Sequence, residues 1–247
     1  MSVPASGAPS ALPGSLRWGN PPSLSAVSLE NWELIQAKVP EAIWETTAMV
    51  AVSTTATLVL GLPLGVLLAL AAPGGLRPNR PLHQALSLLV NIGRSTPFII
   101  LMIALIPLTR LIAGTSLGWQ AACVPLAVGA IPFFARLVEN ALSSVPRGVL
   151  EASQMAGASV WQTAAGVLVR ESVPSLVAAL TVTSVTLVSY SAMAGTVGGG
   201  GLGTLAYYYG YQRFMPDVMV VTIVLTIILV QLLQLAGDRA VAAMSRG

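Results

Sequence analysis

Long apolar stretches with few interruptions dominate the hydropathy pattern of this chain. No charged residue occurs between Glu45 and Arg77, between Arg110 and Arg136, between Glu171 and Arg213, or between Asp217 and Asp238. A bilayer core about 30 Å thick needs about 20 apolar residues in a helix, so each stretch can span a membrane. Together with an irregular segment they predict an all-α integral membrane protein with five transmembrane helices, over about 46–72, 86–112, 119–138, 175–197 and 217–236.

The N-terminal part has a different pattern. Residues 1–28 are rich in Ser, Pro, Gly and Ala, which predicts a disordered N-terminal tail. In residues 29–45 apolar side chains recur at spacings of three and four, which predicts an amphipathic interfacial segment at the membrane surface, anchored by Trp32 and Trp44. Pro40 is expected to break or start a helix there. We assign residues 46–240 to a transmembrane permease domain and residues 241–247 to a cytoplasmic tail.

Two of the predicted spans carry features of their own. In the first, Gly61 and Gly65 form a small-xxx-small pair that lets another helix approach closely, although two incidental glycines would look the same. In the second, Pro97 and Pro107 predict breaks. Arg94 and Arg110 lie 16 positions apart, about 24 Å in a straight helix, so both could snorkel to opposite interfaces. Alternatively, Arg94 is a functional charge inside the membrane.

Charge composition agrees with this class and predicts an orientation. Charged residues make up 9% of the 247 residues, against about 25% in an ordinary soluble domain. Basic residues mark cytoplasmic loops. The loops on one side of the membrane contain six basic residues: Arg77, Arg80, Arg147, Arg170, Arg239 and Arg246. The loops on the other side contain Lys38 and Arg213 close to the spans. This predicts a multi-pass protein with its N-terminus outside and its C-terminus and the 144–174 loop in the cytoplasm.

Several chemical motifs are excluded by their context. The stretch 114–118 matches a nucleophile elbow, but the one histidine, His83, precedes it, and we interpret His83 as a cytoplasmic loop residue. Gly198, Gly200 and Gly203 follow a span, which favours a glycine-rich re-entrant or lumen-side loop over a dinucleotide site. We therefore expect no catalytic residues, no metal site and no nucleic-acid surface. The one lysine, Lys38, follows Ala37, so no Walker A site exists and any ATP–Mg is bound by a partner subunit.

The most informative segment is the loop 144–174. Pro146 can open a first helix, Gly157 supplies a stop where positive φ costs little, and Ser159 with Gln162 forms a capping-box pattern that opens a second helix. Small residues make one end of this hairpin thin enough to dock into a groove. The spacing predicts a cytoplasmic helix–turn–helix hairpin, and the simpler interpretation is a solvated connector.

Glu151-Ala152-Ser153 followed by Gly157 closely resembles the EAA loop of type I ABC importer permeases. The resemblance implies that Glu151, Ala152, Ser153, Gly157 and Ala158 form a coupling helix that sits in a groove of an ATPase subunit. Two departures occur. Ser153 replaces the second alanine of the family, and Val169-Arg170 replaces a Leu-Pro pair, which puts the geometry of membrane re-entry in question although Pro174 remains.

From about 41 to 240 the chain resembles the permease of methionine-uptake ABC transporters. The matching stretches are NIGRSTPFIIL at 91–101, PLTRLIAGTSLG at 107–118, PFFARLVENAL at 132–142, YSAMAGTVGGGGLG at 190–203, YYYGY at 207–211 and AGDR at 236–239. The resemblance implies a homodimer with two ATPase subunits and an extracytoplasmic methionine-binding (lipo)protein. It implies import of L- and D-methionine across the bacterial inner membrane by alternating access. The alternatives are import of another small solute by the same type of machine, or an ATP-independent secondary transporter.

A transport pathway is less clearly marked. Thr183, Thr186, Ser189, Tyr190 and Met193 recur at roughly helical spacing in the fourth span. Such a surface would let a zwitterion with a thioether pass, with Met193 as the candidate gate, but small hydroxyl residues also pack ordinary helices. The tyrosines within 207–211 are expected outside, where they either meet the binding protein or form the interfacial aromatic belt.

Overall fold

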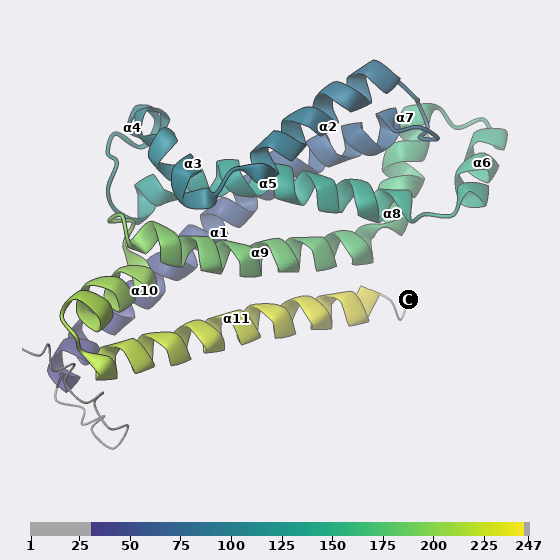
Figure 1. Ribbon diagram of the computed structural model, residues 1–247. Coiled ribbons are helices and arrows are strands. Elements are labelled where there is room, and N and C mark those ends of the chain that lie inside the picture. The colour runs from purple at the N-terminus through teal and green to yellow at the C-terminus, as the bar shows by residue number, and fades with distance from the viewer. Residues whose placement is uncertain (1–30, 245–247) are drawn as a thin grey trace, which may run out of the picture.

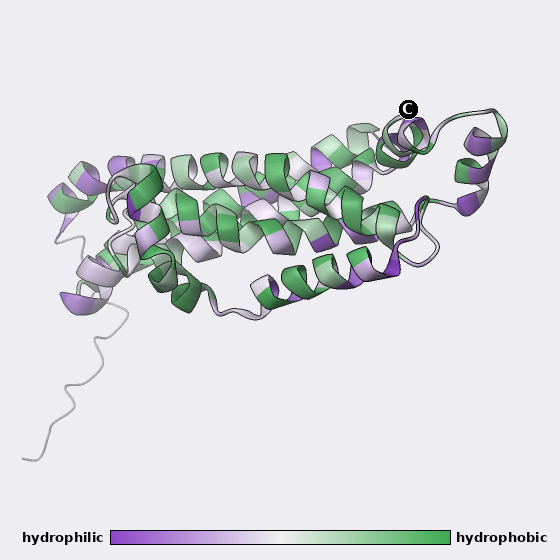
Figure 2. Ribbon diagram, turned by 90° about the horizontal axis from the view of Figure 1, so that it is seen from above, coloured by the Kyte–Doolittle hydropathy of each residue, from purple (hydrophilic) through white to green (hydrophobic). Residues whose placement is uncertain are grey.

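The computed structural model describes residues 31–244, so the predicted tail at 1–28 and the chain's last three residues lie outside the described part. The described chain is helical and forms an elongated bundle (Figure 1). Hydrophobic residues run along the length of the bundle and hydrophilic ones gather towards its two ends (Figure 2). We call the end that carries residues 144–172 the hairpin end, and the end that carries residues 196–204 the glycine-loop end.

Helix α1 (Trp32–Ala71) corrects the prediction for the N-terminal segment. It is one helix of 40 residues, about 60 Å long, with Pro40 and Pro63 inside it. This is about twice the thickness of the bilayer core, and the first part of α1 continues the apolar part as one helix, so Pro40 neither breaks nor starts a helix. Ile35 and Ala42 on this part are buried, and Ala42 packs on Leu202. Tertiary packing therefore keeps the helix intact through Pro40.

The second crossing is broken. Helices α2 (Arg80–Ser95) and α3 (Phe98–Ala104) meet at an angle of 101°, and α4 (Ile106–Ala113) follows as a separate short helix. Pro97 caps α3 and Pro107 lies in the first turn of α4, as the two predicted breaks require. The irregular crossing predicted over 86–112 is confirmed, but the 101° bend contradicts the argument that Arg94 and Arg110 snorkel from the two ends of one helix.

Three further helices complete the bundle: α5 (Trp119–Ser143), α9 (Val173–Gly195) and α11 (Pro216–Met244). With α1 they are the described helices long and apolar enough to cross a membrane, and the bent α2–α3 pair supplies a fifth crossing. The start of α1 and the end of α11 lie at opposite ends of the bundle (Figure 1). Since α11 continues to Met244, residues 241–244 of the expected tail are helical.

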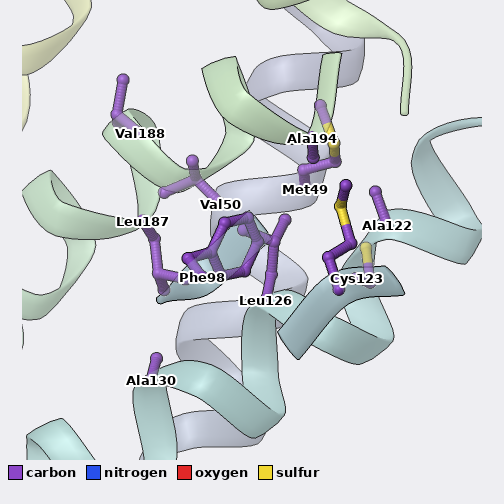
Figure 3. Packing of buried hydrophobic residues seen from close by; sticks show 11 residues of the cluster. Met49, Val50, Phe98, Ala122, Cys123, Leu126, Ala130, Leu187, Val188 and Ala194 are labelled. Atoms are coloured by element: carbon purple, nitrogen blue, oxygen red, sulfur yellow. The ribbon is translucent and has the colours of Figure 1, made fainter. Parts of the chain in front are cut away.

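The core forms where α1, α5 and α9 meet. Met49, Phe98, Leu126 and Leu187 are buried together there (Figure 3). Close approach of α1 and α5 depends on the small-xxx-small pair. A methyl group on Gly61 would lie 2.9 Å from Cδ1 of Phe134, and one on Gly65 would lie 2.5 Å from Cβ of Val138. The prediction that these glycines admit another helix is confirmed.

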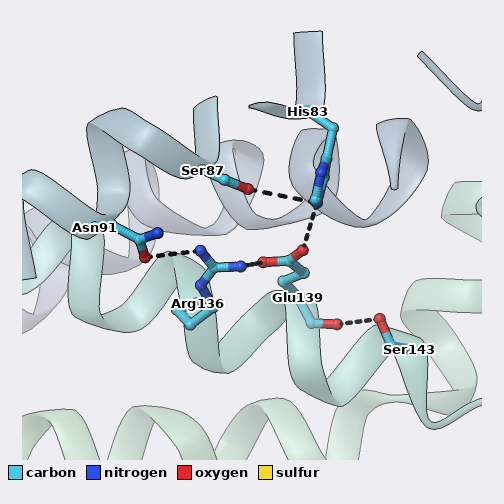
Figure 4. A network of polar contacts seen from close by, with 6 residues as sticks. All are labelled: His83, Ser87, Asn91, Arg136, Glu139 and Ser143. Atoms are coloured by element: carbon cyan, nitrogen blue, oxygen red, sulfur yellow. Dashed lines mark hydrogen bonds and ion pairs between the residues drawn. The ribbon is translucent and has the colours of Figure 1, made fainter. Parts of the chain in front are cut away.

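A polar network fastens α2 to α5 near the hairpin end (Figure 4). The Glu139 carboxylate is buried and accepts a hydrogen bond from Arg136 Nη1 at 2.6 Å, and its other oxygen lies 3.0 Å from His83 Nε2. Arg136 Nη2 also donates to the Asn91 side chain at 2.9 Å. His83 is thus a residue of α2 that pairs with a carboxylate, which corrects its interpretation as a loop residue.

We predict that Glu139→Ala destabilises the permease. The change leaves Arg136 and His83 without their carboxylate, and breaking a buried ion pair costs about 3 kcal/mol. Thermal unfolding in detergent should show a clearly lower midpoint. Ser143→Ala is the matched control, because its hydroxyl donates only to the Glu139 carbonyl of its own helix at 2.8 Å. Equal midpoints for the two variants would refute a stabilising role of the network.

Candidate functional site

The loop 144–174 folds as the predicted hairpin. Helix α6 (Arg147–Met155) starts directly after Pro146 and ends before Gly157, which has a φ of +88°. Helix α7 (Val160–Thr163) begins at a complete capping box, in which Gln162 N donates to Ser159 Oγ at 3.3 Å and Ser159 N donates to Gln162 Oε1 at 2.8 Å. A π-helical turn, η2 (Ala164–Leu168), and α8 (Val169–Glu171) lead back to α9.

The two arms of the hairpin are held together at one polar contact and anchored by apolar packing. Ser153 Oγ and Thr163 Oγ1 lie 3.2 Å apart, and Thr163 is fully buried. Ala164 and Leu168 pack in the same buried cluster as Leu142 at the end of α5. The serine that replaces the family's second alanine therefore has a structural role, because it joins α6 to α7.

The outer face of the hairpin is uncovered. No residue of α6 is buried, and Glu151, Ala152 and Gly157 are exposed, while Ser153 and Ala158 are half-buried. The Met155 side chain is 83% exposed. Within residues 31–244 no ion pair involves Glu151. Glu151 lies one turn inside α6 rather than at its start, so it contributes a free carboxylate to the exposed face and does not cap the helix.

Re-entry into the bundle proceeds without the family's Leu-Pro pair. Val169 and Arg170 continue a helical path, and Ser172 joins α8 to α9 with its amide 3.3 Å from the Leu168 carbonyl oxygen. Pro174 occupies the first turn of α9, where a missing amide hydrogen costs nothing. The hairpin and α9 are therefore linked by one nearly unbroken helical segment.

The predicted pathway residues on α9 separate into two groups. Ser189 and Met193 are exposed, and Thr186, half-buried, lies on the same face at helical spacing. We call these three residues the α9 stripe. Thr183 is completely buried and donates to the Ala179 carbonyl at 2.8 Å, so it belongs to the packed interior and not to the stripe.

Tyr190 does not share the stripe but packs beside it. Its ring stacks on Phe98 of α3, with ring centroids 4.5 Å apart and planes 6° apart. This pair connects the end of the broken second crossing to α9.

Residues 61–246 match the model of the family described as binding-protein-dependent transport system inner membrane component. The chain belongs to this family. It is therefore a multi-pass inner-membrane transport component.

Individual relatives of this transport component are close. The chain is 52% identical over 200 residues to the probable D-methionine transport system permease protein MetI of Vibrio cholerae, covering 81% of this chain and 89% of that one. It is 54% identical over 153 residues to D-methionine transport system permease protein MetI of Escherichia coli K12, covering 62% and 70%.

Solved structures of ABC transporters also match this chain. A chain of the inward-facing MetNI methionine ABC transporter, in its native crystal form, matches with a TM-score of 0.84 and 51% identity, over 86% of this chain and 98% of that one. A second match, to an amino acid ABC transporter with histidines, has a TM-score of 0.64 and 17% identity, and shows the fold alone.

The glycine-loop end of this transport component contains a contact that the sequence does not predict. Gly198, Gly200 and Gly201 all have positive φ, which confirms a tight glycine-rich loop. The amide of Gly201 donates to the Glu45 carboxylate at 2.6 Å and that of Leu202 donates to Thr46 Oγ1 at 2.9 Å. These side chains on α1 hold the start of α10 (Gly201–Thr204). Glu45 and Gly201 are 156 positions apart, so no local sequence pattern joins them.

The tyrosines of η3 (Leu205–Gln212) lie at the same end. Tyr207 stacks on Tyr211 with centroids 5.9 Å apart, and the Arg213 guanidinium lies 4.8 Å from the Tyr209 ring centroid. Tyr211 is 63% exposed. This surface suits either a partner protein or an interfacial belt, as expected.

We predict that Gly157→Ala loosens the hairpin whereas Gly148→Ala does not. A methyl group at either position meets no atom within 4 Å, so the variants differ in backbone conformation alone. At the φ of +88° a side chain costs about 1–2 kcal/mol. Hydrogen exchange at the Ala156 and Ala158 amides should therefore accelerate by roughly 5- to 30-fold. Gly148→Ala, inside α6, should slow exchange slightly; equal behaviour of both variants would contradict the role of Gly157.

Proposed function

We propose that this chain is the permease subunit of an ATP-driven importer that carries methionine, in both its L- and D-forms, across the inner membrane. The single observation that carries the proposal is the exposed hairpin, in which Glu151 forms no ion pair within residues 31–244. The chain that carries this hairpin is 51% identical in sequence to a chain of the MetNI methionine ABC transporter. The D-methionine named for the relatives and the methionine named for MetNI support the choice of cargo.

The hairpin is the surface that the ATPase subunit binds. Two ATPase subunits bind ATP–Mg, and each receives α6 in a groove. An uncovered carboxylate among alanine and glycine fits such a groove, because small residues allow close approach and the charge can accept hydrogen bonds from basic or backbone donors. The thin knob formed by Ala152, Gly157 and Ala158 supplies the shape, and Glu151 supplies the charge.

The hairpin end faces the cytoplasm and the glycine-loop end faces outward. The excess of Lys and Arg in the loops of the hairpin end supports this orientation. It places the start of α1 outside, together with the tyrosine surface of η3, where the extracytoplasmic methionine-binding protein docks. The C-terminus is cytoplasmic.

Two copies of the chain form the pathway between them. When the ATPase subunits close, they move α6, and the helical link through η2 and α8 transmits this movement to α9. Ser189 and Met193 of the α9 stripe are exposed in the single subunit, so the stripe can face the second copy across the pathway. Met193, 47% exposed and next to the glycine loop, is the candidate gate.

We predict that Glu151→Lys abolishes co-purification of the ATPase subunit and ATP-dependent uptake of labelled methionine into proteoliposomes containing the binding protein. Reversing the charge on the exposed face of α6 replaces attraction by repulsion. Glu33→Lys is the control for assembly, because Glu33 is exposed at the opposite end of the bundle from the hairpin and should leave co-purification of the ATPase subunit unchanged.

If Glu151→Lys still co-purifies with the ATPase subunit and still takes up methionine, the proposal is wrong. Uptake of a different solute by the intact wild-type complex would favour an importer of the same type with another cargo. Uptake that persists without any ATPase subunit would favour a secondary transporter.

A further inference from the structure

A cavity of about 260 Å³ lies at the bend between α2 and α3. Arg94 and Thr96 line it from the bend, Phe98 from α3, Gly129 and Phe133 from α5, and Tyr190 from α9. Pockets for drug-sized ligands measure about 300–1,000 Å³, so this cavity suits a smaller molecule, of the size of an amino acid.

Arg94 is the charged group of this cavity, and it has no protein partner. Within residues 31–244, no hydrogen bond or ion pair to Arg94 is found, and its side chain is exposed. Arg136, which also reaches α2, is by contrast matched by Glu139 and Asn91. An arginine that lacks an internal partner needs an external anion or water.

In the proposed orientation, with Arg80 at the cytoplasmic interface, Arg94 lies inside the membrane. It lies 14 positions after Arg80, the first residue of α2, which is about 21 Å along the helix axis. The 101° bend follows immediately, so the helix does not carry this side chain on to the far interface. A cation at that depth is costly and typically serves a pathway.

Aromatic side chains also line the cavity. Phe98 is buried and its ring is stacked on that of Tyr190, which fixes both rings. A flat aromatic wall attracts aliphatic and thioether groups, and ring faces also attract an ammonium group. A guanidinium fork binds a carboxylate with two parallel hydrogen bonds. Cation and rings together therefore match an α-amino acid with an apolar side chain.

The cavity also adjoins the moving part of the subunit. Tyr190 lies within one turn of Met193 on α9, at the edge of the α9 stripe. Any displacement of α9 relative to α3 separates the stacked rings and reshapes the cavity. A ligand held there would be released when α9 moves.

We propose that this cavity is a cargo subsite in which Arg94 holds the carboxylate of the transported amino acid against the rings of Phe98 and Tyr190. The inference rests on the proposed function and deepens it, because it names the group that recognises the cargo within the membrane.

The test uses the assembled permease–ATPase complex with Cys123→Ala and a reporter cysteine, Thr96→Cys, at the cavity wall. Methionine should slow modification of the reporter cysteine by a thiol reagent, whereas methioninamide, which lacks the carboxylate, should not. Arg94→Gln should weaken this protection about tenfold or more, because a charge-assisted hydrogen bond is lost. Arg110→Gln is the control, since Arg110 is exposed on α4 with Ser116 as its partner, and protection should persist.

Equal protection by methionine and methioninamide, or undiminished protection in Arg94→Gln, would overturn the inference. Should Arg94→Gln not assemble, Arg94→Lys decides, because lysine keeps the charge without the fork; weaker protection supports the subsite and unchanged protection overturns it. Normal methionine uptake with a failed protection test removes this subsite alone. A wild-type complex that accumulates no methionine removes the proposed function and the subsite with it.

Discussion

A peptide group in the hydrocarbon core must find its hydrogen-bond partner inside the protein, and this constraint determines where the chain can be irregular. The long helices α1, α5, α9 and α11 satisfy it along their own axes. Irregular backbone occurs where protein covers it. The α2–α3 bend packs on α5 and α9, and the glycine loop is bonded by Glu45 and Thr46. The hairpin, which is exposed, lies at one end of the bundle.

In the proposed mechanism the subunit has an input and an output that are joined by helical segments. The input is the hairpin around Glu151, whose two arms are joined by Ser153 and Thr163. The output is the α9 stripe, which the same helical segment reaches through η2 and Pro174. The Glu139 network fastens α2 to α5 beside the hairpin.

Local chemistry made the hairpin predictable from sequence. Gly157 and the Ser159–Gln162 box act within a few residues of themselves, so their signals survive folding. Contacts between distant segments were not predictable. His83 meets Glu139 across 56 positions, and Pro97 predicted a break after Arg94 but not the angle of 101° between α2 and α3, which depends on their packing against the rest of the bundle. For the same reason Pro40 did not end α1. Arg136 and Glu139 are three positions apart on one helix, and this spacing predicts an ion pair between them. It does not predict that His83 of α2 joins the pair.

The claim on which the account depends is that force applied to the hairpin moves α9. It is tested most directly by spin labels on Met193→Cys in both copies of the assembled complex, after Cys123→Ala, with the distance between labels measured by pulsed electron resonance. The account predicts that trapping the ATPase with ATP and vanadate changes this distance, and that Glu151→Lys abolishes the change. A distance that stays constant on trapping, in a complex that still transports, would contradict it.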